Sequence, residues 1–483
     1  MRLGDLFAEA SGETAARAVT GLASDSRKVT PGDVFVAVPG TRADGLAYLP
    51  QALEKGAAAI VAEAERPAAL DPSVPYLRVA DVRRALALAA ARLHPGQPEK
   101  VVAVTGTSGK TSVADFARQI FAALGHRSAS IGTLGVITSD GEAYGSLTTP
   151  DPISLHRSLD RLAREGIARL AMEASSHGLD QARLDGVRLA AAAFTNLGHD
   201  HLDYHETMEA YRDAKLRLFT TLLPEGAPAV INADGAMHEP FAEAARAGGR
   251  EVMTTGRNGE TLRLLGTRRD GFAQDLTVRA GGETISVRFP LVGDFQIENA
   301  LLAAGLVMAC ERDRPPAEIV ATLAGLRGVP GRLEIVGETR GALAIVDYSH
   351  KPDALEHVLT TLRPFATGRL VCVFGCGGDR DKGKRPIMGR IASELADEVV
   401  VTDDNPRSED PAAIRAEILA GATGAREIGD RAEAIRGAVL GLQPGDVLVV
   451  AGKGHETGQI VGERTLPFSD HEVTRAALAE RNG

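Results

Sequence analysis

The sequence predicts an α/β protein of three domains, and three observations support that prediction. Apolar runs alternate with amphipathic helical stretches from residue 101 to about 328, which indicates a largely parallel sheet flanked by helices. Pro- and Gly-rich breaks at LHPGQPEK (93–100) and GVPGRLE (328–334) separate that block from its neighbours. The 483 residues of the chain also suffice for about three domains. We therefore expect domains at 1–97, 98–328 and 329–483.

The N-terminal block is expected to form a mixed α/β domain. It contains three short strand-like runs, VFVAVPG (34–40), AAAIVAEAE (57–65) and YLRVAD (76–81).

The central block begins with a strand, a Gly-rich turn and a helix start in VVAVTGTSGKTSVADF (101–116). Backbone N–H groups of the turn 107–109 can surround anionic oxygens, Lys110 adds a cation, and Thr111 offers a hydroxyl to Mg²⁺. The usual phosphate-loop pattern needs a further glycine at the position of Val104. The strand–turn–helix context still predicts nucleotide binding, on a parallel sheet like that of P-loop ATPases.

Two further motifs in this block indicate metal chemistry. The run RLAMEASSHG (169–178) carries Glu173 where a Mg²⁺-binding carboxylate would lie beside the loop, and TNLGHDHLDYH (195–205) concentrates His and Asp. A dinuclear zinc site is an alternative, but Tyr204 breaks the H-x-H-x-D-H spacing of zinc hydrolases, and Mg²⁺ prefers oxygen ligands. A regulatory GTPase is not favoured, because no Asn-Lys-x-Asp guanine-recognition sequence occurs.

The C-terminal block repeats one pattern, an apolar strand that ends in a polar or Gly-rich turn. The pattern occurs in ALAIVDYSH (342–350), RLVCVFGCGGDRDKGK (369–384), EVVVTDDNPR (398–407) and DVLVVAGKGHE (446–456). Open α/β sheets bind ligands just beyond the carboxyl ends of their strands. We expect a Rossmann-like domain with candidate site residues along that edge.

The bulk composition limits the class of protein. The formal net charge is −10 and there is no long basic run, so a large nucleic-acid-binding surface is not expected. No window reaches the roughly 18 apolar residues of a membrane helix, and no signal peptide is visible. Three cysteines, Cys310, Cys372 and Cys376, predict reduced thiols rather than disulfides or zinc. These features predict a cytoplasmic protein that binds small molecules, without membrane insertion.

Taken together, the motifs resemble those of one family, the Mur ligases. Its members are ATP-dependent amide-forming enzymes of peptidoglycan assembly, and folylpolyglutamate synthetases are relatives. Their shortened phosphate loop does without the first glycine, which accounts for Val104. The resemblance covers nearly the whole chain through TGTSGKT (105–111), TTPD (148–151), MEASSHGL (172–179), TNLGHDHLDYH (195–205), YRDAKLRLF (211–219), GDFQIENALLAA (293–304), GVPGRLE (328–334), VDYSHKPDALE (346–356) and AGKGHE (451–456).

Within the family, the chain is most similar to the member that adds the third residue of the peptide. The resemblance implies ligation of meso-2,6-diaminopimelate to the D-glutamyl γ-carboxylate of UDP-N-acetylmuramoyl-L-alanyl-D-glutamate. ATP is the co-substrate, an acyl phosphate is the intermediate, and Mg²⁺ is the cofactor. A monomer is expected, with a uridine-nucleotide-binding N-terminal domain and an amino-acid-binding C-terminal domain.

The resemblance also implies the residues of each subsite. Those implied for ATP are Gly106, Thr107, Ser108, Gly109, Lys110, Thr111, Ser112, Asn299, Arg332 and Asp347. Those implied for the UDP-sugar peptide are Ser24, Ser26, Thr41, Arg42, Ala43, Thr148, Thr149, Ser175, Gln181 and Arg183. Those implied for diaminopimelate are Arg380, Asp404, Asn405, Pro406, Arg407, Gly452 and Glu456. The implied catalytic residues are Lys110, Lys215 and His201, and the implied metal ligands are Thr111, Glu173, His201 and Lys215 as a carbamate.

Two of these residues have plain structural alternatives. The DNPR motif (404–407) could be a solvated turn. The family resemblance instead implies that Arg407 selects diaminopimelate, because a guanidinium can bind the second carboxylate of that amino acid in a bidentate manner. Glu456 suits the distal ammonium. Lys215 could be a solvated lysine on a helix, whereas the family match implies a carbamylated lysine. Carbamylation requires a neutral amine, so we expect Lys215 to be desolvated or near other cations.

Overall fold

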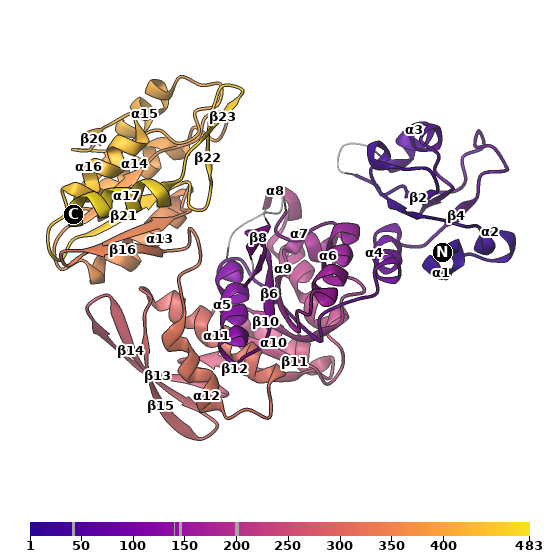
Figure 1. The fold of residues 1–483 in the computed structure, drawn as a ribbon, viewed down its shortest axis with the longest axis horizontal. Helices are drawn as coiled ribbons and strands as arrows, with labels where there is room; N and C mark the ends of the chain where they lie inside the picture. The colour runs from indigo at the N-terminus through magenta and orange to yellow at the C-terminus, as the bar shows by residue number, and fades with distance from the viewer. Residues whose placement is uncertain (41–43, 140, 144–146, 199–201) are drawn as a thin grey trace. The chain divides into compact units, whose positions relative to one another are not determined.

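The structure, a computed structural model, describes residues 1–40, 44–139, 141–143, 147–198 and 202–483 (Figure 1). The chain divides into two compact units. Unit 1 comprises Met1–Leu264, Arg279–Glu283 and Leu301–Val320, and unit 2 comprises Leu265–Val278, Thr284–Ala300 and Ala321–Gly483. Strands and helices alternate throughout, which confirms the predicted α/β class.

Unit 1 begins with a small sheet of four parallel strands, as the mixed α/β prediction requires. The strands follow the chain in order, β1 (Gly21–Ala23), β2 (Asp33–Val36), β3 (Ala59–Ala62) and β4 (Tyr76–Arg78). Their side chains alternate between two hydrophobic cores, with Val34 and Val61 in one and Phe35 and Ile60 in the other. The helices are α1 (Leu3–Leu6), α2 (Gly12–Ala16), α3 (Leu49–Glu54) and α4 (Val82–Leu93).

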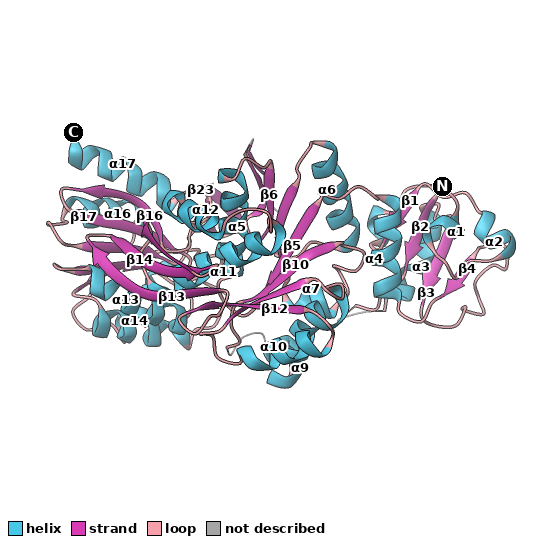
Figure 2. Ribbon diagram, turned by 90° about the horizontal axis from the view of Figure 1, so that it is seen from below, coloured by secondary structure: helices cyan, strands magenta, loops and turns pink. Residues whose placement is uncertain are grey.

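An 11-stranded sheet follows, in the order β15-β14-β13-β12-β11-β10-β5-β9-β6-β7-β8. The six strands from β12 to β6 run parallel, and β7 and β8 are antiparallel additions, which confirms a largely parallel sheet (Figure 2). The bounds are β5 (Lys100–Thr105), β6 (Ser128–Gly132), β7 (Gly135–Thr138), β8 (Gly141–Ala143), β9 (Arg169–Glu173), β10 (Leu189–Phe194), β11 (Pro228–Asn232), β12 (Glu251–Gly256), β13 (Leu262–Asp270), β14 (Ala273–Ala280) and β15 (Glu283–Phe289).

The helices of the central region begin where side chains can cap them. Asp151 accepts from the Ser154 N–H at the start of α6, and Ser175 and Thr207 do the same for α7 and α9. The bounds are α5 (Lys110–Ala123), α6 (Pro152–Arg164), α7 (Ser176–Asp180), α8 (Leu202–His205), α9 (Met208–Arg217), α10 (His238–Ala247), α11 (Asp294–Cys310) and α12 (Pro316–Ala321).

The C-terminal region is a doubly wound sheet, as the Rossmann-like prediction states. The strand order is β16-β17-β21-β18-β19-β20. In the described part of the chain, β16 pairs antiparallel with β17, and the other strands of this sheet run parallel to one another. One face packs on α13, α14 and α15, and the other packs on α16 and α17. The bounds are β16 (Glu334–Thr339), β17 (Ala342–Asp347), β18 (Leu370–Phe374), β19 (Glu398–Val401), β20 (Arg426–Glu427), β21 (Val447–Ala451), α13 (Pro352–Leu362), α14 (Lys384–Leu395), α15 (Pro411–Leu419), α16 (Arg431–Leu440) and α17 (Asp470–Asn482).

A two-stranded hairpin, β22 (Gly458–Val461) and β23 (Arg464–Pro467), follows β21. Its first strand meets the turn after β19 through a bridge between Arg407 and Val461. The hairpin therefore fixes the backbone of the DNPR motif.

The three cysteines are free thiols, as predicted. Burial raises the pKa of each, Cys310, Cys372 and Cys376, to about 12. Among the described residues, none of the helices has both the length and the apolar character needed to cross a membrane.

Candidate active site

The predicted phosphate loop joins β5 to α5 and needs glycine at two positions. Gly109 is the N-cap of α5 with φ +85°, and Gly106 has φ +144°. A Cβ on Gly106 would lie 1.8 Å from the Thr195 hydroxyl oxygen. Val104, which replaces the first glycine of the longer pattern, is instead a buried strand residue paired with Glu173 of β9. The loop therefore begins at Gly106.

Residues just after β10 hold this loop in place. The Asn196 carbonyl oxygen accepts from the Thr107 N–H (2.8 Å), and its side-chain oxygen accepts from the Ser108 N–H (3.1 Å). The Thr195 hydroxyl donates to the Ser108 carbonyl oxygen (2.7 Å). A nucleotide that used the Thr107 and Ser108 N–H groups would have to replace their bonds to Asn196. Thr195 and Asn196 open the motif TNLGHDHLDYH, but their contacts with the phosphate loop were not predicted, although they follow an apolar strand that pairs with β5.

The two predicted catalytic lysines meet at the start of the loop. Lys110 Nζ donates to the carbonyl oxygens of Gly106 and Thr107, each at 2.9 Å, and Lys215 Nζ donates to the Gly106 oxygen at 2.7 Å. Lys215 is only 1% exposed, and its Nζ lies 4.3 Å from the centre of the Tyr211 ring. This burial excludes a solvated lysine on a helix surface.

Glu173 and Thr111, two of the predicted metal ligands, line one small cavity between α5, β6 and β9. Glu173 is 2% exposed, and its Oε1 accepts from the Thr133 N–H (2.7 Å). A Cβ on Gly132 would lie 2.1 Å from the same oxygen, so glycine is needed there for the carboxylate to fit.

Some predicted residues lie outside the described part of the chain. They are His201, with its neighbours His199 and Asp200, and the predicted uridine-nucleotide contacts Thr41, Arg42 and Ala43. In the described ranges, no three His, Cys, Asp or Glu side chains gather closely enough to hold a metal ion.

The predicted peptide-binding residues of the central region form one hydrogen-bonded cluster. The Thr149 hydroxyl accepts from the Ser175 N–H and hydroxyl, both at 3.0 Å, and donates to the Glu173 carbonyl oxygen. Arg183 donates to the Thr149 carbonyl oxygen (2.8 Å) and to the Gln181 side-chain oxygen (2.7 Å). The cluster thus connects directly to the strand that carries Glu173.

Three further predicted sugar-nucleotide and peptide contacts belong to other parts of unit 1. The Thr148 hydroxyl lies 3.1 Å from that of Thr133, the residue that also binds Glu173. In the N-terminal sheet, Ser24 is exposed after β1, whereas Ser26 is buried and donates to Gln51 (2.6 Å).

The remaining predicted ATP contacts lie in unit 2. Asn299 is a buried residue of α11, and the Arg332 guanidinium lies 5.2 Å from the centre of the Tyr348 ring. Asp347 ends β17, and its carboxylate accepts from the N–H groups of Leu333 (2.7 Å) and Ser349 (2.8 Å). Burial raises the pKa of Asp347.

The predicted diaminopimelate residues gather beyond the carboxyl ends of β18, β19 and β21. A Cβ on Gly377 would lie 2.7 Å from the Arg407 guanidinium and 3.9 Å from Arg380, so both arginines border the same glycine. Arg407 Nη1 also donates to the Gly378 carbonyl oxygen (2.8 Å). Gly452 approaches the Asp404 carboxylate closely, and Pro406 is buried between the turns.

Asn405 and Glu456 are joined to each other and to a residue that the sequence analysis missed. The Asn405 side-chain nitrogen donates to Glu456 Oε2 (2.9 Å). Lys453, fully buried, donates to Asn405 Oδ1 (2.9 Å) and to Glu456 Oε2 (3.1 Å). Its place in the GKGHE stretch, directly after a buried strand, was the signal that could have identified it.

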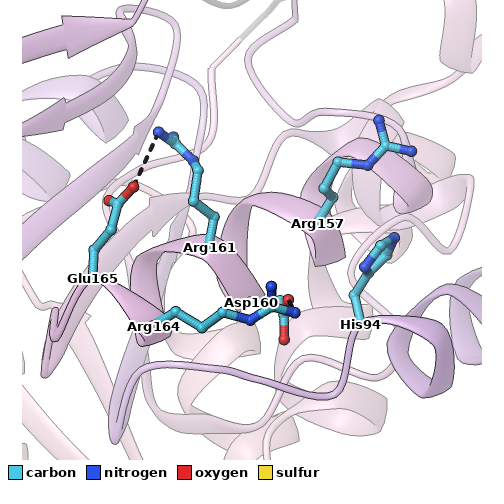
Figure 3. A pocket seen from close by; sticks show the side chains of 6 residues that line it. All are labelled: His94, Arg157, Asp160, Arg161, Arg164 and Glu165. Carbon is cyan, nitrogen blue, oxygen red and sulfur yellow. Dashed lines mark hydrogen bonds and ion pairs between the residues drawn. The ribbon is translucent and has the colours of Figure 1, made fainter.

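A surface hollow between α4 and α6 contains none of the predicted site residues (Figure 3). Its arginines are largely neutralised by neighbouring carboxylates, since Arg161 pairs with Glu165 (3.6 Å) and Arg164 pairs with Asp160. The hollow therefore gives no argument for a ligand.

Three family models match the chain in order: "Mur ligase family, catalytic domain" over residues 18–94, "Mur ligase middle domain" over 104–307, and "Mur ligase, glutamate ligase domain" over 331–454. Together they cover most of the chain.

Curated relatives match over nearly their whole length. The chain is 58% identical to the UDP-N-acetylmuramoyl-L-alanyl-D-glutamate--2,6-diaminopimelate ligase of Agrobacterium fabrum over 98% of this chain and 95% of the relative. It is 54% identical to the ligase of the same name from Caulobacter vibrioides, with 95% of each chain covered.

Solved structures share the fold. A structure of a UDP-N-acetylmuramoyl-L-alanyl-D-glutamate--2,6-diaminopimelate ligase superposes with a TM-score of 0.76 at 32% identity, over 100% of this chain and 99% of that one. MurF ligase from Thermotoga maritima in complex with ADP has a TM-score of 0.59 at 20% identity, with 96% and 97% covered, which shows the fold alone.

Proposed function

The chain belongs to the Mur ligase family, and we propose that it joins meso-2,6-diaminopimelate to the D-glutamyl γ-carboxylate of UDP-N-acetylmuramoyl-L-alanyl-D-glutamate in an ATP-dependent reaction of peptidoglycan precursor synthesis. The observation that carries the proposal is the 54–59% identity to ligases of that name over at least 95% of the chain. The clusters around Lys110 and Arg407 supply groups suited to its two half-reactions.

In the first half-reaction, a γ-carboxylate oxygen attacks the γ-phosphorus of ATP. The bond to the β,γ-bridging oxygen breaks, and ADP leaves, so the products are an acyl phosphate and ADP. Phosphoryl transfer depends on alignment and charge neutralisation more than on covalent bonds to protein. Lys110 supplies a cation at the loop, and the N-terminus of α5 favours negative charge there.

In the second half-reaction, an amine of diaminopimelate attacks the acyl carbon. A tetrahedral intermediate forms, inorganic phosphate leaves, and the amine loses a proton as the amide is made. Arg380 and Arg407 provide guanidinium groups for the carboxylate that lysine lacks, and Glu456 provides a carboxylate for the distal ammonium. This division of charge suits diaminopimelate better than lysine.

Mg²⁺ is the proposed cofactor. Oxygen ligands suit this ion, and the Thr111 hydroxyl and Glu173 carboxylate line the same cavity beside the loop. When bound, Mg²⁺ would neutralise charge on the phosphates. We also propose His201 and a carbamate on Lys215 as ligands, as the family resemblance implies. The burial of Lys215 and its proximity to Lys110 are the two conditions expected for carbamylation.

We further propose domain boundaries at 1–97, 98–328 and 329–483, with the UDP-sugar in the first domain and the amino acid in the third. Ser24, Ser26 and the Thr149 cluster would bind the UDP-sugar peptide, and Asn299, Arg332 and Asp347 would contact ATP. We also propose that the enzyme is a monomer in the cytoplasm, because all three proposed substrates are small molecules.

The decisive experiment measures ADP release with the UDP-sugar dipeptide and one amino acid at a time. We expect turnover with meso-diaminopimelate to exceed turnover with L-lysine or L-ornithine. An ATP sensor would show no amino-acid-dependent turnover, and a folate-type ligase would respond to folate plus glutamate. Equal ADP release with and without an acceptor amino acid would refute the proposal.

A further inference from the structure

Lys453 is a buried cation that none of the proposed steps uses. It follows Gly452 at the carboxyl end of β21, and its side chain is 0% exposed. A buried ammonium is costly unless its donors are satisfied. Here it donates to Asn405 Oδ1 at 2.9 Å and to Glu456 Oε2 at 3.1 Å, so both described acceptors belong to the proposed amino-acid site.

Lys453 fixes which way the Asn405 amide points. Oδ1 accepts from Lys453 Nζ and from the Ile460 N–H (2.9 Å), and both of these groups can only donate. The oxygen of the amide must therefore face Lys453. The amide nitrogen is left facing Glu456, where it donates to Oε2 at 2.9 Å.

The same contacts hold one oxygen of Glu456. Oε2 accepts from both Lys453 and Asn405, whereas Oε1 takes part in neither bond. The Glu456 side chain remains 34% exposed. Lys453 thus positions the carboxylate so that Oε1 can meet a ligand amine.

The charge of Lys453 also bears on selectivity. The proposed site contains two guanidinium groups, Arg380 and Arg407, and two carboxylates, Asp404 and Glu456, whose charges balance. Lys453 makes the set net positive. This excess positive charge favours diaminopimelate, which has a second carboxylate. It disfavours lysine, which has the distal ammonium but lacks that carboxylate.

We propose that Lys453 is a positioning residue that orients Asn405 and Glu456 for the acceptor amino acid and favours diaminopimelate over lysine. This inference rests on the proposed ligase function. It concerns the acceptor amino acid alone. Loss of Lys453 should therefore change the KM for diaminopimelate and leave the KM values for ATP and the UDP-sugar dipeptide nearly unchanged.

The test compares Lys453→Met and Lys453→Gln with wild type in the full enzyme. The KM for meso-diaminopimelate should rise roughly tenfold or more in Lys453→Met, as expected for loss of charged hydrogen bonds. The KM values for ATP and the UDP-sugar dipeptide should change less than about twofold by the same reasoning. The ratio of kcat/KM for diaminopimelate to that for L-lysine should fall. Lys382→Met, which removes an exposed ammonium in the same domain, is the matched control.

A double-mutant cycle with Glu456→Gln separates positioning from a general loss of structure. If Lys453 acts through Glu456, the double variant should lose less transition-state stabilisation, calculated from kcat/KM for diaminopimelate, than the two single variants lose together. Lys453→Gln keeps a donor without the charge, so it should also lower the diaminopimelate-to-lysine ratio, and it decides the question if the Met variant does not fold.

Two results would overturn the inference while leaving the ligase function intact. One is an unchanged diaminopimelate KM and selectivity ratio in Lys453→Gln. The other is an equal rise in all three KM values with additive losses in the cycle. A wild-type enzyme without amino-acid-dependent turnover would instead refute the proposed function.

Discussion

Lys110 and Lys215 donate to the same acceptor, the carbonyl oxygen of Gly106, at 2.9 and 2.7 Å. One lysine comes from the start of α5 and the other from the last turn of α9, about a hundred residues further along the chain. The shared oxygen brings the two lysine side chains together at the entrance of the phosphate loop. The arrangement places Lys215 beside the proposed phosphoryl-transfer site even though it lies on a helix of low overall hydrophobicity.

Lys215→Ala should lower turnover by about a hundredfold or more, because it removes the amine proposed to carry a carbamate ligand of Mg²⁺. Steady-state ADP release measures this loss, and small carboxylates should restore part of it. Arg212→Ala on the same helix is the matched control, since the Arg212 side chain donates to the neighbouring Asp213 on the exposed side of the helix. Full activity in Lys215→Ala would contradict the assignment.

Glu173→Gln should raise the Mg²⁺ concentration needed for half-maximal activity by roughly ten- to a hundredfold, as expected when a group that supports metal binding is lost. The amide can still accept from Thr133, so the fold around β9 should persist. A Mg²⁺ titration of the rate provides the measurement. Asp115→Asn is the control, because Asp115 lines the same cavity but binds Arg118 and Gln119. The same Mg²⁺ dependence in both variants would exclude Glu173 as a ligand.

Arg407→Lys should lower kcat/KM for meso-diaminopimelate by about ten- to a hundredfold, because an ammonium cannot form the bidentate pair with a carboxylate. Activity with L-lysine, which lacks that carboxylate, should change far less. Competition between the two amino acids measures the ratio directly. Arg390→Lys, at an exposed pair with Glu394, serves as the control. Parallel losses with both acceptors would show that Arg407 does not select the substrate.

Glu409→Gln should change how stability depends on pH. Hydrogen bonds from Arg385 hold the pKa of Glu409 at about 2, below its usual 4.5. A lowered folded-state pKa stabilises the protein above pH 4.5, and that contribution is lost as the pH falls toward 2. The Tm of the variant should therefore be lower than that of wild type at pH 7, and the difference between the two Tm values should shrink as the pH falls. Scanning calorimetry from pH 7 to the acid limit provides the test, and a constant gap would contradict it.

The sequence predicted the elements whose signals are local. The apolar run before Glu173 is long enough for one strand, and β9 does end at that residue. The α/β class followed from the alternation of such runs with helical patterns. Likewise, the turn after β19 was expected to carry site residues, because parallel strands end at one edge of a sheet.

Contacts across the sheet could not be predicted from the sequence alone. Asn196 binds the loop at Ser108 only because β10 lies beside β5. The local sequence of a strand does not determine which strands are its neighbours in the sheet. Lys453 and Asn405 are separated by 48 residues and meet because β21 and β19 flank β18. A lysine in a Gly-rich turn looks solvated until the order of those strands is known.

The high pKa values of the three cysteine thiols make the enzyme convenient for labelling studies. Thiolates, not thiols, react with maleimides, and a pKa of about 12 leaves almost no thiolate at neutral pH. The native protein should therefore give little background with such reagents. A pair of new surface cysteines, one in each compact unit, could then carry fluorescent dyes, and the distance between the units could be followed during turnover without first removing any natural thiol.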